Sequence, residues 1–326
     1  MTARTALGPH TKHPPPPRRA LGRHTAPQHG HTLTRPADQH KTYGRLLSQL
    51  RVRHIGTIRE LMSITAQSTL PVAPYSGGKR LLSRRLCTMI DADKHTAYAE
   101  PFVGMGGVFL RRKSRPTAEI INDKGRDVAN LFRILQRHYP QFLQMLRFQI
   151  TTRIEFDRLT LTNPDTLTDL ERAARFLYLQ RTAFGGKASN RNFGVAKERP
   201  GRFNLTNLEP MLEDLHTRLA GVVIECLDYT QFITRYDGPN TLFYLDPPYW
   251  GCERDYGDNL FARDDHARLA DVLRHIKGRF ILSINDRPEI RSLYQWAVCE
   301  PVAVTYTIGL GKNNKRPKAG ELIVTP

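Results

Sequence analysis

An aspartate, two prolines and a tyrosine occupy residues 246–249 of this 326-residue chain, directly after the apolar run 241–245. The prolines fix two φ angles and remove two backbone N–H donors, so carbonyl groups there point outward with no helix to bond them. Asp246 and the Pro247 carbonyl can therefore form a pair of hydrogen-bond acceptors beside the ring of Tyr249. Such an edge suits a flat nucleobase with an exocyclic amino group. The same residues are also typical of a strand end and turn, so the motif alone leaves both interpretations open.

A second candidate site is the sequence Ala-Glu-Pro-Phe-Val-Gly-Met-Gly-Gly at 99–107, between a strand-like run and the start of a helix. Glycines there allow a ligand to approach the backbone, and a helix N-terminus favours polar or anionic groups. Asp123 ends the next predicted strand, where a carboxylate can bond ribose hydroxyls or, alternatively, cap a helix. NAD and S-adenosylmethionine both contain adenosine, so these features fit either cofactor. Glu100 and Pro101 favour S-adenosylmethionine.

The net charge of the chain is +18, and residues 1–61 contribute +9 of it, from 11 Lys and Arg against 2 Asp and Glu. The remainder also carries +9, which favours a polyanionic partner. The four cysteines are isolated, so a disulfide framework or zinc site is not expected, and a reducing cytoplasm fits. No apolar run reaches the ~18 residues of a membrane helix, and no signal sequence is evident.

From residue 66 onward, strand-like and helix-like runs alternate, which predicts the α/β fold class. A capping box at Thr168 and Glu171 predicts the start of one amphipathic helix. The predicted strands are 96–102, 118–122, 222–227, 242–245 and 280–284, with a closing antiparallel pair at 302–307 and 321–324. The predicted helices are 81–90, 126–138, 141–156, 208–219, 229–234, 266–276 and 290–294, and a helix is also expected to begin at 108–112.

The segment 181–202 holds six Lys and Arg against one acid, with two phenylalanines between them. Lysine and arginine neutralise phosphates, and asparagine or arginine can contact base edges. A solvated flexible loop is the alternative interpretation. The candidate residues for contact with a nucleic acid, which the resemblance described next implies to be DNA, are Arg181, Lys187, Asn190, Arg191, Lys197 and Arg199.

Taken in order, four segments resemble the DNA adenine methylase family, the alpha-type methyltransferases that modify the exocyclic N(6) of adenine. They are residues 74–79, 100–104, 121–123 and 246–249. Residues 224–229, 280–286 and 321–323 are also similar, and 184–187 has a form similar to phage and prophage members. The resemblance covers roughly residues 70–326. It implies a Rossmann-like S-adenosylmethionine-dependent methyltransferase sheet, mostly parallel, with a helical target-recognition insertion.

The resemblance also implies residue roles. Asp246 and the Pro247 carbonyl would accept hydrogen bonds from the adenine amino group, and Tyr249 would stack on the flipped base. Tyr75 stands where the family more often has tryptophan, and Tyr229 could instead be a core residue. The cofactor-binding residues implied are Tyr75, Lys79, Glu100, Phe102, Gly104, Asp123, Asp228, Tyr229 and Asp246.

Three regions are expected along the chain. Residues 1–65 are expected to form a disordered basic extension rich in proline and histidine. Met62 is a candidate start of the natural protein, in which case the residues before it are not native. Residues 66–135 and 207–326 form the catalytic domain, and 136–206 the target-recognition domain. The expected cofactor is S-adenosylmethionine without a metal. We expect the protein in the cytoplasm of a bacterial or phage-infected cell, with duplex DNA as its partner and no membrane association. A monomer or weak dimer is expected, and a restriction endonuclease partner is left open.

Several alternative functions remain at this point. The motifs also fit cytosine N(4), RNA or protein glutamine methyltransferases. A DNA-binding relative without catalysis would keep the same fold. A nicotinamide oxidoreductase would explain the glycine loop, but it gives residues 246–249 no evident role in hydride transfer.

Overall fold

The computed structural model describes residues 64–75, 77–194, 198, 200–257, 259–305 and 318–326, all within the unit Glu60–Pro326. Our expectations for residues 1–63, including the extension and a start at Met62, lie outside these residues. The same holds for Lys197 and Arg199.

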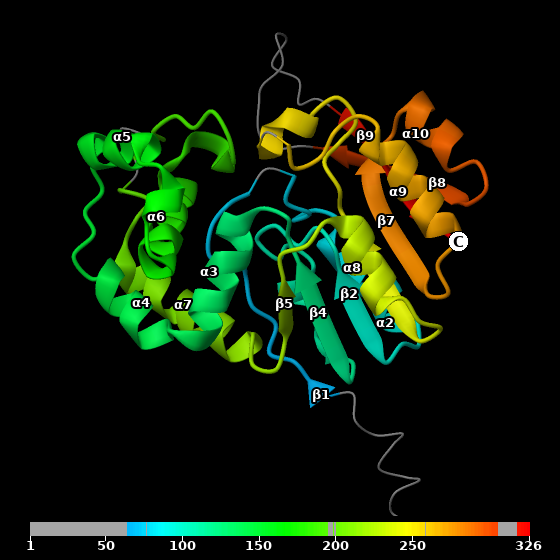
Figure 1. Ribbon diagram of the computed structural model, residues 1–326, viewed down its shortest axis with the longest axis horizontal. Helices are drawn as coiled ribbons and strands as arrows, with labels where there is room; N and C mark the ends of the chain where they lie inside the picture. Colours follow the sequence, from blue (N-terminus) through cyan, green and yellow to red (C-terminus); the bar gives the residue numbers. More distant parts are fainter. Residues whose placement is uncertain (1–63, 76, 195–197, 199, 258, 306–317) are drawn as a thin grey trace, which may run out of the picture. The chain divides into compact units, whose positions relative to one another are not determined.

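Seven strands form one sheet in the order β5-β4-β2-β6-β7-β9-β8 (Figure 1). The first five of these are mutually parallel, whereas β9 runs antiparallel to both β7 and β8. The predicted α/β class, with a mostly parallel Rossmann-like sheet, is confirmed. The strands are β2 (Ala97–Glu100), β4 (Ala118–Asn122), β5 (Val223–Glu225), β6 (Thr241–Leu245), β7 (Arg279–Asn285), β8 (Val298–Thr305) and β9 (Lys318–Thr325).

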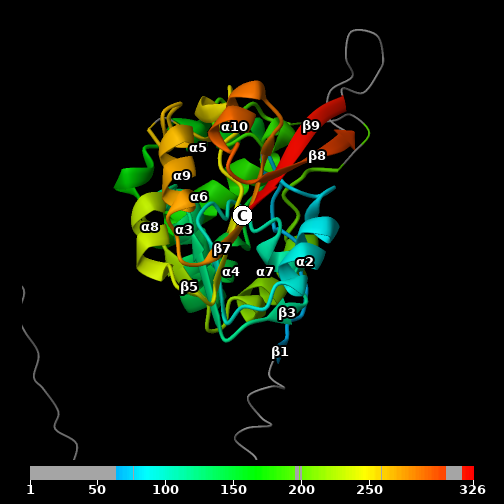
Figure 2. The ribbon, with the colours of Figure 1, turned by 90° about the vertical axis from the view of Figure 1, so that its right-hand side faces the viewer.

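Alternate residues of the central strands supply two hydrophobic cores, one on each face of the sheet. In β6, Leu242 and Tyr244 belong to one core, and Phe243 and Leu245 to the other. A parallel sheet covered on both faces needs such continuous apolar strands. Helices α8 (Tyr229–Tyr236), α9 (Asp265–Arg274) and α10 (Pro288–Leu293) pack on one face. Helices α2 (Ser83–Ala92) and α3 (Arg126–Arg137) contribute to the core on the other face. In Figure 2, α2 lies on the opposite side of the sheet from α8 and α9.

Helices α4 (Tyr139–Leu146), α5 (Arg153–Leu161), α6 (Asp169–Thr182) and α7 (Leu205–Arg218) lie beyond the β5 edge (Figure 1). Helices α4, α6 and α7 pack against α3, and α5 packs against α6. The capping box that opens α6 is present, since Thr168 and Glu171 bond each other's backbone N–H. Buried leucines of α6 and α7 join the core that contains α3, so these helices share a continuous apolar interior with the sheet.

The prediction of one helix over 141–156 is wrong, because the chain is not helical at 147–152 between α4 and α5. The hydroxyl of the buried Tyr178 bonds the carbonyls of Ile150 and Thr152, at 3.1 Å in each case. The side chain of Thr152 caps α5 by accepting from the N–H of Glu155. These bonds replace those that a continuous helix would make.

The prediction that a helix begins at 108–112 is also wrong, since only a 3₁₀ turn, Phe109–Arg111, forms there. The carbonyls of Leu110 and Lys113 accept from the N–H groups of Thr69 and Ala66. The chain then forms β3 (Ser114–Arg115), which pairs with β1 (Ile64–Thr65). The carbonyls that would propagate a helix are therefore taken by the preceding segment.

One buried side chain connects the carboxyl ends of three strands. Asn122 at the end of β4 donates to the carbonyls of Pro101 and Leu227, at 2.9 and 3.1 Å, and accepts from the N–H of Leu227. Pro101 follows β2, and Leu227 follows β5. The asparagine thus fixes the spacing of the loops that begin at these ends.

We expect Asn122→Ala to lower the free energy of unfolding by about 2–4 kcal/mol, because three buried or partly buried backbone groups lose their partner. Urea denaturation measures the loss. The exposed Asn207→Ala in α7 serves as the matched control and should change stability by less than about 0.5 kcal/mol. Equal stability of the two variants would contradict this role of Asn122.

Candidate active site

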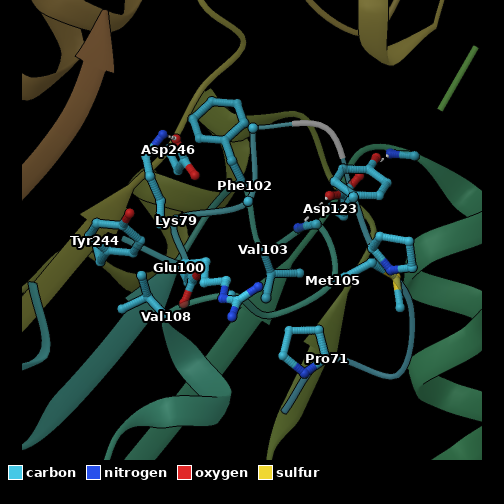
Figure 3. A pocket seen from close by; sticks show the side chains of 18 of the residues that line it. Pro71, Lys79, Glu100, Phe102, Val103, Met105, Val108, Asp123, Tyr244 and Asp246 are labelled. Carbon is cyan, nitrogen blue, oxygen red and sulfur yellow. Dashed lines mark hydrogen bonds and ion pairs between the residues drawn. The ribbon is translucent and has the colours of Figure 1, made fainter. Parts of the chain in front are cut away.

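Three carboxyl groups lie at the same edge of the sheet because three parallel strands end there. Glu100 is the last residue of β2, and Asp123 and Asp246 directly follow β4 and β6. All three line one cavity of about 1050 Å³ (Figure 3). In that view Asp246 and Asp123 lie on opposite sides of Phe102. The cavity is lined by eight of the nine predicted cofactor residues: Tyr75, Lys79, Glu100, Phe102, Gly104, Asp123, Tyr229 and Asp246.

Asp123 is bonded to the two glycine-containing loops beside it. Its Oδ2 accepts from the N–H of Gly104 at 3.0 Å, and its Oδ1 from the N–H of Gly125 at 2.7 Å. Burial raises the pKa of Asp123 to about 6, and these two hydrogen bonds oppose the rise. The residue therefore anchors the glycine loop while its carboxyl group lines the cavity.

The glycine loop needs glycine for two separate reasons. Gly104 and Gly106 have φ angles of +49° and +75°, in the left-handed region. A Cβ atom at Gly106 would also lie 2.8 Å from Cγ of Leu110. The loop can therefore turn tightly against the wall of the cavity only with these residues.

Three aromatic rings form part of the cavity wall. Phe102 lies 5.5 Å from Tyr229 and 5.8 Å from Phe261, measured between ring centroids. Tyr229 is 2 % exposed, and its hydroxyl contacts Asp265 and accepts from Arg268. Tyr229 is thus both a core residue and part of the cavity wall.

A buried lysine lines the cavity beside Asp246. The Nζ of Lys79 is 2.6 Å from Oδ1 of Asp246 and donates to the hydroxyl of Tyr249 at 2.6 Å. The Oε2 of Glu321 lies 3.8 Å from the same nitrogen, and the Tyr249 hydroxyl donates to Oε1 of Glu321. Lys79 also lies 4.4 Å from the centroid of the Tyr249 ring. Burial raises the pKa of Asp246 to about 6, and the Lys79 ammonium opposes this rise.

Glu100 lies beneath this cluster and is 2 % exposed. Its Oε2 accepts from the hydroxyl of Tyr98 at 2.6 Å. Burial raises the pKa of Glu100 to about 8, the Tyr98 hydrogen bond opposes the rise, and the charge of Asp246 adds to it. Glu100 therefore holds its proton to a higher pH than an exposed glutamate does.

Asn285 holds the segment that follows Asp246. Its side chain accepts from the N–H of Trp250 at 2.9 Å and donates to the carbonyl of Trp250 at 3.0 Å. Asn285 is the last residue of β7, the strand beside β6. Residues 246–250 are therefore fixed to the sheet at both ends.

The sequence matches the family model of the D12 class N6 adenine-specific DNA methyltransferases over residues 75–308. The chain belongs to this family. It is 24% identical to a type II methyltransferase of Paramecium bursaria Chlorella virus NC1A over 69% of this chain and 86% of that protein. It is 26% identical to a Lactococcus lactis type II methyltransferase over 78% of this chain and 94% of the relative. A Haemophilus influenzae DNA adenine methylase is also 26% identical, over 78% and 92% of the two chains.

The protein is thus an enzyme that methylates the N6 amino group of adenine in DNA, and its family implies S-adenosylmethionine as the methyl donor. The predicted family and activity are confirmed. Within the described part of the chain, no group of three or more His, Cys, Asp or Glu residues is placed to hold a metal ion. No helix among those residues is long and apolar enough to cross a membrane.

The predicted DNA-binding residues of the basic loop 181–202 fall into two groups, one exposed and one bonded within the protein. Lys187 and Asn190 are exposed. Arg181 instead bonds the carbonyls of Val72 and Arg202 and lines the cavity. Arg191 donates to the carbonyl of Lys187 and to Gln180, at 3.2 and 3.3 Å. These two arginines therefore hold the loop in place.

The remaining predicted cofactor residue, Asp228, does not line the cavity. It caps α8 by accepting from Thr230, and it pairs with Lys124 at 3.2 Å. Although burial opposes it, the hydrogen bonds from Thr230 and Lys124 keep the pKa of Asp228 below its usual value. Lys124 itself lines the cavity, so Asp228 can influence a ligand there through this lysine.

Sequence reasoning missed the roles of Phe261 and Glu321 in the site. Phe261 follows a loop with no motif, and Glu321 lies in a strand predicted only as part of the closing antiparallel pair. The similarity of residues 321–323 to the family was the one available signal for Glu321.

We expect Glu100→Gln to stabilise the methyltransferase more at about pH 8 than at about pH 5. The folded protein keeps a proton on Glu100 up to about pH 8, whereas the usual pKa is 4.5, so the contribution of Glu100 to stability falls as pH rises between these values. Glutamine resembles the protonated acid and does not titrate. Thermal unfolding across this pH range measures the difference, with the exposed Glu289→Gln as control. A difference independent of pH would contradict the raised pKa.

Proposed function

We propose that the cavity holds S-adenosylmethionine and that Asp246 receives a flipped adenine of duplex DNA beside it. The observation that carries this proposal is the position of Asp246, which lines the cavity and also begins the rigid segment 246–250. An adenine within a duplex cannot present its amino group to such an edge, so the base must leave the stack.

The lining of the cavity suits the different parts of the cofactor. The rings of Phe102, Tyr229 and Phe261 offer apolar faces for its adenine. Asp123 has a carboxyl group suited to ribose hydroxyls. Tyr75, Lys79, Glu100 and Gly104 line the remainder and would surround the methionine end. When bound, S-adenosylmethionine supplies a methyl group activated by a cationic sulfur.

The carboxylate of Asp246 and the carbonyl of Pro247 would each accept one N–H of the adenine amino group. Two acceptors favour a pyramidal nitrogen, whose lone pair is then directed away from the ring. Positive charge develops on this nitrogen during transfer, and the Asp246 carboxylate stabilises it. The Tyr249 ring would stack on the base and hold it in position. Apart from charge stabilisation, these residues would accelerate the reaction mainly by positioning the amino group.

We expect Asp246→Asn to lower methyl transfer by at least about 100-fold while the fold is retained, because the charge that opposes the developing cation is lost. The measurement is transfer of labelled methyl from S-adenosylmethionine to adenine-containing duplexes, followed by nucleoside analysis. Asp264→Asn is the matched control, because Asp264 is exposed and its side chain does not cap α9. Turnover at the wild-type rate in Asp246→Asn would refute the role, and label on cytosine would identify the alternative base.

Residues 136–206 would form the target-recognition region. Lys187 and Asn190 are exposed in the basic loop, and Asn190 has a φ angle of +46°. Between them, Ser189 donates to the carbonyls of Arg254 and Asp255 at 3.2 and 3.1 Å. These carbonyls belong to the 3₁₀ turn Glu253–Tyr256 that follows residues 246–250. The contact joins the loop proposed to bind DNA to the segment that follows the acceptor edge.

Charge reversal by Lys187→Glu should weaken duplex binding and leave the dissociation constant of S-adenosylmethionine unchanged, because the lysine is exposed and would contact phosphate. Fluorescence anisotropy at several salt concentrations measures DNA binding, and the salt slope should fall by about one unit. Lys94→Glu is the control, since Lys94 is exposed before the amino end of β2, opposite the site. Equal weakening by both variants would argue against a specific contact.

A further inference from the structure

The proposed acceptor Asp246 already has a partner in the structure. The Lys79 ammonium lies 2.6 Å from Oδ1 of Asp246 and is itself buried, with 3% of its side chain exposed. An adenine amino group needs the same carboxylate as its acceptor. The positive charge of Lys79 also opposes the stabilisation of a second positive charge on the reacting nitrogen. Lys79 thus competes with the amino group for this carboxylate, and a change in how Lys79 is paired would favour methyl transfer.

A second carboxyl group lies close to the same ammonium. Oε2 of Glu321 is 3.8 Å from Nζ of Lys79, and the Glu321 side chain is 2% exposed. A shift of the ammonium toward Glu321 would bring it within hydrogen-bond distance without moving the backbone. The lysine side chain suits this shift because it carries a point charge on a flexible stem.

Glu321 is held rigidly relative to the acceptor edge. It lies in β9 and pairs in register with Asn285 of β7, the residue that bonds Trp250. Its Oε1 accepts the hydroxyl of Tyr249, the ring proposed to stack on the base. The Glu321 side chain therefore contacts both Lys79 and Tyr249 from β9, the strand between β7 and β8.

We propose that Glu321 is a positioning residue for methyl transfer. It takes up the Lys79 ammonium when the adenine amino group occupies Asp246, and it fixes the ring of Tyr249 through the hydroxyl. This inference rests on the proposed role of Asp246 as the acceptor of the amino group. Glu321 itself touches neither the base nor the methyl group.

The test is a double-mutant cycle between Glu321→Gln and Lys79→Met, measured as single-turnover methylation of an adenine-containing duplex. Glutamine keeps the size of the side chain and a hydrogen-bond acceptor for Tyr249 but cannot pair the ammonium. Glu321→Gln should slow the chemical step by about 10- to 100-fold, because the ammonium stays on Asp246. The dissociation constant of S-adenosylmethionine should stay within about twofold. In the Lys79→Met background, Glu321→Gln should change the rate by less than about twofold.

Controls separate this inference from folding and from the role of Asp246. Glu300→Gln removes an exposed glutamate of the neighbouring strand β8 and should keep the wild-type rate. If Glu321→Gln does not fold, Glu321→Asp keeps the charge but withdraws it by one methylene, and it should show a smaller, Lys79-dependent loss. A wild-type rate in the variant that folds, or the same loss in both Lys79 backgrounds, overturns the inference. An active Asp246→Asn overturns the proposed function instead.

Discussion

The convergence of three strand-end carboxyl groups at one edge of the sheet is the constraint on which the active site depends. Parallel pairing brings Glu100, Asp123 and Asp246 to this edge, and burial there raises the pKa of each. Uncompensated acids in such a place would repel one another and destabilise the fold. The structure resolves this differently for each acid: backbone N–H groups bond Asp123, Tyr98 bonds Glu100, and Lys79 pairs with Asp246.

Two asparagines satisfy backbone groups near the strand ends at the cavity. Strand ends leave backbone groups unpaired, and aspartate commonly satisfies them as a cap. Here Asn122 bonds the loops after β2 and β5, and Asn285 bonds the segment after β6. An amide side chain can both donate and accept hydrogen bonds, whereas an ionised carboxylate can only accept them. The segment after β6 is therefore held without using the carboxyl group of Asp246, whose partner in the structure is Lys79.

Much of this arrangement could be predicted from sequence because the strand-end motifs are local. The runs before Glu100, Asp123 and Asp246 mark buried strands, and their order fixes a shared edge. Phe261 and Glu321 could not be found this way, since their contacts join residues far apart in sequence. The break before α5 depends on the hydroxyl of Tyr178, and the partners of Arg191 depend on how its loop folds back. Pattern and spacing carry no information on such contacts.

Buried arginines and the buried Lys79 pair with carboxyl groups in different ways. In the core, Glu119 is bonded by Arg112 and by both Nη atoms of Arg218, and these two guanidinium groups stack on Tyr98 and Phe109. Planar, bidentate pairs of this kind fix one geometry. At the active site the cation is instead Lys79, which has two carboxyl groups within 4 Å. A lysine can exchange partners there, whereas an arginine fork would hold Asp246 in a fixed pair and keep it from the base.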